Sequence, residues 1–215
     1  MDQVSFKERV RQTAIECSKE YKEKFVKYDY LVCSTAFSNK YYIISAREDN
    51  YQHLTGVHSL ISAQEFFNKS YDGTLLESDF DFSKRGQSEK SVKGSVREKI
   101  AVLKDTMDLF SYKDIYVEES FCKNKVLCSF ATAIPLFTLG FTNNVYATPK
   151  SLLKNNQLTA NTNKVDLIIR KLRTEKDFSE IILLDEEKVD IYYDEIKTLI
   201  SAEISDTLLQ HSCVS

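Results

Sequence analysis

The chain has 215 residues, a formal net charge of −3 and 42% hydrophobic residues, with only five glycines and two prolines. Its length suits one substantial hydrophobic core and is short for two, so we expect a single domain over residues 1–215. It contains neither an apolar run as long as a transmembrane helix nor a signal peptide, so we expect a cytoplasmic protein without a membrane partner.

Cysteines, histidines and short motifs give no sign of a metal or a cofactor. The five cysteines are an odd number without a C-x-x-C pair, which is typical of reduced thiols in the cytosol. Histidines and cysteines never form ligand-like pairs, and the motifs of standard nucleotide hydrolases, zinc proteases and esterases do not occur. We therefore expect no metal and no cofactor. Paired catalytic carboxylates remain open, because acidic residues are plentiful.

The first elements are a helix and a hairpin. Within residues 4–27, spacings of four, three, four and four predict one apolar helical face made of Val10, Ala14, Cys17, Tyr21 and Phe25. Tyr28–Phe37 and Lys40–Ala46 are rich in β-forming residues and flank a Ser-Asn turn, so they predict a β-hairpin. We expect this hairpin inside an antiparallel sheet, with the N-terminal helix packed on it.

The hairpin leads into the most distinctive stretch of the chain, which holds two of the three histidines, His53 and His58. We expect Gln52–Gly56 to be extended. In an extended backbone His53 and Thr55 project to the same face, and Gly56 allows a sharp bend immediately afterwards. The alternative is that His53 is a half-buried polar residue at a sheet edge and Thr55 an ordinary strand residue.

Two capping boxes predict where the next helices begin. Ser62 with Glu65 begins a helix that ends before Asp72, and the free amide groups of its first turn lie close in sequence to the histidines. Ser95 with Glu98 begins another helix, after a polar stretch, 83–93, that we expect to be a mobile surface loop. Its inward apolar positions are Val96, Ile100, Leu103 and Met107, so Arg97 and Lys99 should point away from the core.

The middle of the chain predicts short strands and its end predicts a helix. The strand-like runs are 115–118, 126–133, 135–141, 144–148, 167–172 and 179–184, and residues 189–208 carry one apolar helical face. The predicted fold class is therefore α+β, an antiparallel sheet packed by N-terminal and C-terminal helices. We divide it into an N-terminal helix (1–27), a core (28–185) and an acidic C-terminal helix (186–215).

Charge is distributed unevenly along the chain. Residues 84–104 and 150–176 each carry seven basic residues against two acidic ones, whereas 177–206 carry ten acidic residues against two lysines. This pattern fits a phosphate-facing side and a solvated back. It also fits ordinary exposed helix faces and loops.

The stretch around His53 resembles a known group of nucleases. A strand, a short acidic loop, His53-Leu54-Thr55-Gly56 and a helix opening Ser-Ala-Gln-Glu-Phe-Phe are similar to the phage-associated branch of the barnase, EndoU, colicin and RelE-like (BECR) nucleases. Leu75–Phe80, Lys104–Phe110 and Tyr146–Leu152 fit the same branch, so the resemblance spans roughly residues 25–185. It implies a RelE/barnase-like α+β core and a ribonuclease that acts as a toxin or in conflict between phage and host.

The resemblance carries over His53 and Thr55 as site residues, and with them the Pro149–Ser151 block. Metal-independent RNA cleavage needs a base for the ribose 2′-hydroxyl, an acid for the departing 5′-oxygen and cations for the phosphorane. Histidine suits either proton transfer because its pKa is about 6.5. We expect His53 in that role, Thr55 as a hydrogen-bond donor to phosphate, and Lys150 as an ammonium at a rigid strand end after proline. The candidates for binding RNA are Arg97, Lys99, Tyr146 and Ser151.

Other interpretations of these residues stay open. Thr148–Ser151 also fits a strand end that caps a following helix, and Tyr146 also fits packing on a sheet. The acidic net charge and the acidic C-terminal helix depart from the nuclease pattern. Two alternatives follow, namely a catalytically inactive RNA- or protein-binding module of the same fold, and a protein-binding accessory factor of a mobile element. For an active enzyme we expect RNA as the partner, and a cognate inhibitor or another protein partner stays open.

Overall fold

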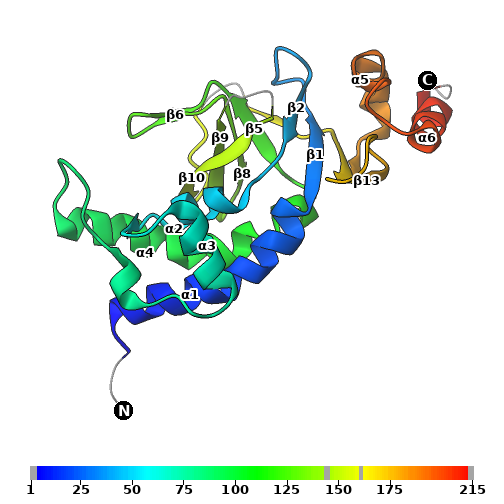
Figure 1. Ribbon diagram of the computed structural model, residues 1–215. Helices are drawn as coiled ribbons and strands as arrows, with labels where there is room; N and C mark the ends of the chain where they lie inside the picture. Colours follow the sequence, from blue (N-terminus) through cyan, green and yellow to red (C-terminus); the bar gives the residue numbers. More distant parts are fainter. Residues whose placement is uncertain (1–3, 143–145, 160–161, 213–215) are drawn as a thin grey trace.

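The computed structural model describes residues 4–142, 146–159 and 162–212 of the chain. It has the expected α+β class, with antiparallel sheets and with helices at both ends of the sequence (Figure 1). Instead of one sheet, however, the strands form two main sheets and two short two-stranded pairs. In the part of the chain that the structure describes, no helix is both long and apolar enough to cross a membrane.

The first main sheet has four strands in the order β13-β12-β1-β2 and contains the predicted hairpin. Its strands are β1 (Tyr28–Cys33), β2 (Tyr41–Ile44), β12 (Leu167–Leu172) and β13 (Glu180–Leu184). In the register of this sheet, Tyr30 of β1 lies opposite Ile44 on one side and Arg170 on the other. This sheet therefore pairs β1 with a strand that is far from it in sequence.

The second main sheet has five strands in the order β10-β9-β8-β5-β11. Its strands are β5 (Tyr116–Glu119), β8 (Phe130–Ile134), β9 (Phe137–Thr142), β10 (Thr148–Lys154) and β11 (Asn163–Lys164). The two short pairs are β3 (His58–Ser59) with β4 (Phe80–Asp81), and β6 (Cys122–Lys123) with β7 (Val126–Leu127). The predicted strand 144–148 lies partly outside the described residues.

A short parallel bridge joins the two main sheets. The Ser45 amide donates to the Ala147 carbonyl at 2.9 Å, and the Ala147 amide donates to the Ile43 carbonyl at 2.7 Å. This bridge places the beginning of β10 beside the end of β2. Since β2 leads into the histidine stretch, that stretch lies against β10.

The α-helices that come before β5 in the chain form a layer on one side of the sheets (Figure 1). They are α1 (Phe6–Tyr21), which continues as a π-helical turn (Lys22–Val26), α2 (Tyr51–Thr55), α3 (Ala63–Tyr71) and α4 (Glu89–Thr106). We expected the helix within residues 4–27 to pack on the hairpin. Its first part, α1, packs mainly on α3 and α4, and its last part, the π-helical turn, contacts β1. Helix α4 contacts β9 and β10 and so lies between α1 and the second sheet.

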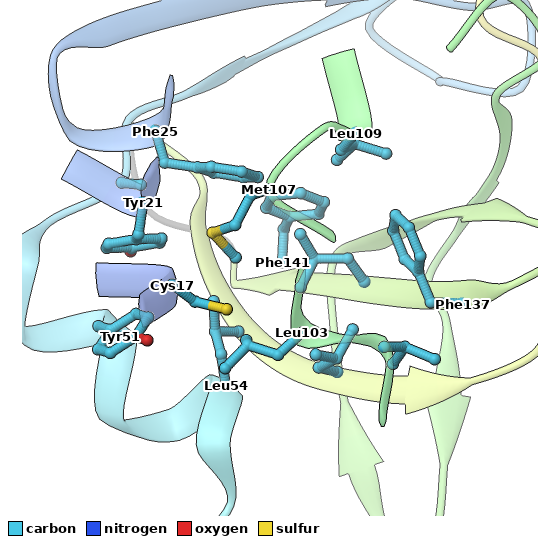
Figure 2. Packing of buried hydrophobic residues seen from close by; sticks show 14 of the residues in the cluster. Cys17, Tyr21, Phe25, Tyr51, Leu54, Leu103, Met107, Leu109, Phe137 and Phe141 are labelled. Atoms are coloured by element: carbon cyan, nitrogen blue, oxygen red, sulfur yellow. The ribbon is translucent and has the colours of Figure 1, made fainter. Parts of the chain in front are cut away.

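The main core fills the space between these helices and the sheets. Figure 2 shows side chains of α1, α2, α4 and β9 converging there, among them Cys17, Leu54, Leu103 and Phe141. All four side chains are buried, with at most 3% of their surface exposed. Burying one side chain of this kind contributes roughly 1.5–3 kcal/mol, so the apolar stripes of α1 and α4 are sufficient reason for both helices to dock.

Two predicted helix boundaries are wrong. Helix α4 begins at Glu89, because Ser88 accepts a hydrogen bond from the Ser91 amide and Val92 extends the buried stripe by one turn, which leaves Ser95 inside the helix. The predicted C-terminal helix is divided into α5 (Val189–Ile196) and α6 (Ala202–Ser212). It breaks because the backbone of Phe178 pairs with the chain on both sides of Ile200.

The acidic C-terminal helices pack on the four-stranded sheet, away from α2 (Figure 1). Leu31 and Cys33 of β1 face α5 and α6 in a second hydrophobic cluster, whereas Tyr30 and Val32 of the same strand face the main core. Asp166, which is 1% exposed, ties this end together by accepting hydrogen bonds from Lys188 at 2.6 Å and from the Tyr192 hydroxyl.

Replacing Asp166 should destabilise the protein measurably. Asp166→Ala leaves the buried Tyr192 hydroxyl without its acceptor, and an unsatisfied buried group of this kind costs about 1–3 kcal/mol. Asp185→Ala is the matched control, because Asp185 pairs with the same lysine at 3.6 Å on the surface, where such pairs contribute about 0–1 kcal/mol. Urea denaturation measures both losses, and equal losses would contradict a special role for Asp166.

Candidate functional site

His53 lies on α2, a single helical turn whose opposite face is anchored in the core. The Tyr51 hydroxyl donates to the Ala14 carbonyl of α1 at 2.6 Å, and Leu54 is fully buried. Successive residues of a helix are about 100° apart, so these anchors turn His53 outward, where it is exposed. The expectation of an extended backbone here is wrong. Burial of two apolar side chains three residues apart favours a helix, which Gly56 ends with a φ of 78°.

Thr55 does not share the face of His53. Its side chain is fully buried, and its hydroxyl donates to the Gln52 carbonyl at 2.8 Å. On a helix, residues two apart point about 200° away from each other, whereas on a strand they would have pointed the same way. The expected contact between Thr55 and phosphate therefore has no support in this geometry.

Lys99 of α4 supports the end of α2. Its Nζ donates to the His53 carbonyl at 3.0 Å, and its stem passes so close to Gly56 that a Cβ there would lie 2.6 Å from Lys99 Cδ. We expected Lys99 to point away from the core, but it is half-buried. Because the last carbonyls of a helix lack intrahelical partners, this ammonium caps α2 and fixes the backbone of His53.

The charge of Lys99 affects the protonation of His53. The pKa of His53 is lowered, first by burial against the surrounding protein and then by the charge of Lys99, with a smaller contribution from Lys84 and an opposing one from Asp49. Burial, together with the charge of Lys84, lowers the pKa of Lys99 to about 8. His53 is therefore mainly neutral at pH 7, whereas Lys99 remains mainly protonated there.

His58 is a second positioned histidine. It lies on β3, opposite Asp81 of β4, and its Nδ1 is 2.9 Å from Asp81 Oδ1 and 3.0 Å from Ser83 Oγ. Ser83 donates from both its amide and its hydroxyl to the same Asp81 oxygen at 2.8 Å, and these bonds, with His58, lower the pKa of Asp81. A carboxylate on Nδ1 favours the tautomer with the proton there, which leaves Nε2 available for chemistry.

Both histidines line one cavity of about 660 Å³, which we call the histidine cavity. Strand β10 contributes Lys150 and Ser151 to its wall, and the Lys150 Nζ donates to the Leu127 carbonyl at 2.8 Å. The ionisable residues of the lining are His53, His58, Lys84, Lys99 and Lys150. No Asp or Glu occurs among the lining residues that the structure describes, so an acidic chain presents a locally basic cavity.

The structure thus brings together four of the seven residues expected from the sequence, namely His53, Lys99, Lys150 and Ser151. Besides Thr55, two are placed elsewhere. Arg97 lies on another face of α4, with its guanidinium 5.0 Å from the centre of the Phe6 ring, and Tyr146 is 47% exposed but does not line the cavity. We expected Lys150 and Ser151 to follow the last residue of a strand. They lie inside β10 instead, near its first residue, so that expectation is wrong.

Sequence reasoning missed His58 and Lys84 as site residues. The sequence does contain features that point to both residues, because His58 lies five residues after His53 and Lys84 is the first residue of the first basic segment. The pairing of His58 with Asp81 depends on strands of two residues each, which carry no periodic pattern. Over the described ranges, no three His, Cys, Asp or Glu side chains form a group that could hold a metal ion.

Comparison with protein families gives a match over most of the chain. A family model described as phage-Barnase-EndoU-ColicinE5/D-RelE like nuclease 4 matches residues 15–199, which include every residue of the histidine cavity. Searches of curated proteins and of solved structures find no significant match.

The close approach of Lys99 to Gly56 predicts a stability difference between two glycines. Gly56→Ala and Gly73→Ala both force a side chain into positive φ, which costs about 1–2 kcal/mol. Only Gly56→Ala also displaces Lys99, and losing that hydrogen bond should cost about 1 kcal/mol more. Urea denaturation of the two variants measures the difference, which should vanish in a Lys99→Ala background. Equal losses in the wild-type background would contradict the contact.

The charge of Lys99 predicts a shift in the titration of His53. Followed by NMR, the His53 ring should titrate below the ordinary histidine pKa of about 6.5. Its pKa should rise in Lys99→Met, because the neighbouring charge is removed, but not fully, because burial remains. Lys90→Met, which removes an exposed cation from the same helix, is the control and should leave the titration unchanged. An unaltered His53 titration in Lys99→Met would disprove the coupling.

Proposed function

This chain belongs to the phage-Barnase-EndoU-ColicinE5/D-RelE like nuclease 4 family, and we propose that it is an endoribonuclease that cleaves RNA without a metal ion. The observation that carries the proposal is a single basic cavity lined by two histidines. Two imidazoles supply the base and the acid that cleavage by the ribose 2′-hydroxyl requires. In the phage context that the family name gives, such an enzyme would act as a toxin on RNA.

His53 is suited to be the general base. Its lowered pKa keeps the imidazole neutral near pH 7, so it can accept the proton of the 2′-hydroxyl. The 2′-oxygen then bonds to phosphorus, and the bond from phosphorus to the 5′-oxygen breaks. His58, fixed by Asp81, donates a proton to that leaving oxygen from Nε2. The products are a 2′,3′-cyclic phosphate and a free 5′-hydroxyl.

The lysines and Ser151 are suited to hold the phosphate. Lys84 and Lys150 bring two ammonium groups to the cavity, and Ser151 adds a hydroxyl from the same strand as Lys150. Positioned cations stabilise the charge that develops on the phosphorane. Lys99 acts differently, because its Nζ already caps the His53 carbonyl. It is a positioning residue for the base.

Loss of either histidine should reduce the rate without a comparable loss of binding. His53→Ala and His58→Ala should each lower kcat by about 10²- to 10⁴-fold, because each removes one proton transfer. The affinity for RNA should stay nearly constant, since the lysines remain. Cleavage by the wild type should continue in EDTA and leave 2′,3′-cyclic phosphate ends. Gel assays of a defined RNA, with affinity measured by fluorescence anisotropy, check these outcomes.

Two further variants separate catalysis from positioning. Asp81→Asn should lower kcat and leave KM nearly unchanged, because the ring of the proposed acid is no longer oriented by a carboxylate, and thermal unfolding separates this effect from a loss of structure. Lys90→Ala, on α4 but outside the cavity lining, should leave the rate unchanged. Wild-type cleavage by His53→Ala would remove this residue from the mechanism. A wild type that binds RNA without cutting it would favour an inactive binding module.

A further inference from the structure

A second cavity adjoins the first. It has a volume of about 1010 Å³, and His58 and Lys84 line both cavities. We call it the phenylalanine cavity, after Phe6 at the start of α1 and Phe82 just after β4. His58, the proposed general acid, therefore lies on the border between the two.

Aromatic side chains form the apolar part of the phenylalanine cavity. The rings of Phe6 and Phe82 are 5.3 Å apart between centroids, with planes inclined by 31°. Phe82 is nearly buried, at 6% exposure, whereas Phe6 is half-buried and keeps part of its surface open. The guanidinium groups of Arg9 and Arg97 lie 5.8 and 5.0 Å from the centre of the Phe6 ring. A partly exposed ring that packs against a second ring, with cations beside it, offers a surface on which a nucleobase can stack.

Charges around these rings favour an anion. The cations of the lining are Lys7, Lys84, Arg85 and Lys93, and the acids are Asp81 and Glu89. Both acids are already engaged, Asp81 by His58 and Ser83, and Glu89 by Lys93 at 2.6 Å. Lys84 and Arg85 are exposed and form no ion pair with any residue that the structure describes. Of these two, Lys84 also lines the histidine cavity, so positive charge without an acidic partner lies where the two cavities adjoin.

Lys84 and Arg85 lie in a tight backbone turn. The Gln87 amide donates to the Lys84 carbonyl at 3.1 Å, and Gly86 between them has a φ of 75°. The turn also brings the Gln87 side chain to the cavity wall. Its amide can donate and accept hydrogen bonds at once, as the edge of a base requires. The phenylalanine cavity thus combines a stacking surface, a polar side chain and cations.

We propose that the phenylalanine cavity binds a nucleobase of single-stranded RNA, the one next to the phosphate that is cut in the histidine cavity. The proposal rests on the proposed ribonuclease function. The bond to be cut joins two nucleotides, and His58 lies where the two cavities meet. A base enters such a cavity only when it is not stacked in a duplex, so the preferred substrate is unpaired RNA.

Binding to an uncleavable oligonucleotide tests the subsite apart from catalysis. One probe is a short single-stranded RNA with a 2′-O-methyl group at every position, which leaves no free 2′-hydroxyl for cleavage, and the other is the same backbone without bases. Phe6→Leu keeps an apolar side chain but removes the ring, so it should weaken binding of the first probe by about 5- to 150-fold. It should leave binding of the second within about twofold. Anisotropy at fixed salt concentration measures both.

Arg85→Ala is the matched comparison. We assign the Arg85 guanidinium to the phosphate backbone, which both probes contain. The variant should therefore weaken binding of both probes equally and lower the salt dependence of binding. Phe82→Leu removes the second ring of the pair and should likewise weaken binding of the probe with bases more than that of the probe without them. Thermal unfolding shows whether each variant is folded.

The outcomes separate the two proposals. Equal weakening of both probes by folded Phe6→Leu and Phe82→Leu overturns the base subsite, whether or not the wild type cleaves RNA. Selective weakening together with a wild type that never cleaves RNA supports the subsite and overturns the nuclease. Failure of the wild type to bind either probe overturns the subsite and leaves a protein partner as the occupant of this surface.

Discussion

Two backbone hydrogen bonds between the segments around Ser45 and Ala147 determine how the proposed site is assembled. They join the two main sheets at one point and set β10 against the chain that leads into α2. Ile44 and Ala147 are both buried, and buried backbone groups need hydrogen-bond partners, so the join resists slippage. His53 and Lys150, which are far apart in sequence, meet because of it. The hydrophobic core stabilises the fold, and these two hydrogen bonds set the position of β10 relative to α2.

The histidine cavity gathers like charges in a chain whose net charge is negative. Lys99 loses hydration on the way into the protein, and the charge of Lys84 opposes its protonation further. No acidic residue of the described lining offsets this repulsion. A bound anion would offset this repulsion, and groups of perturbed pKa cluster at functional sites.

Sequence reasoning succeeded where local patterns decide the structure and failed where contacts between distant residues do. Ser62 caps α3 as its spacing with Glu65 indicates, and β12 has the predicted bounds, because both follow from adjacent residues. The turn of α2 is helical only because Tyr51 and Leu54 are buried against α1 and α4. His53 could be chosen from sequence, but its partner His58 depends on Asp81, which only the folded chain brings near.

The position of β1 has a consequence for how the protein is made. Both faces of this strand are buried in different clusters, and one of its neighbours is β12, near the end of the chain. A ribosome must therefore pass Leu172 before β1 has both neighbours, and it passes Ser151 before the histidine cavity has its far wall. Fragments that end earlier lack part of the cavity. The order of strands thus delays completion of the first sheet until β12 and β13 have been synthesised, long after the residues of α2.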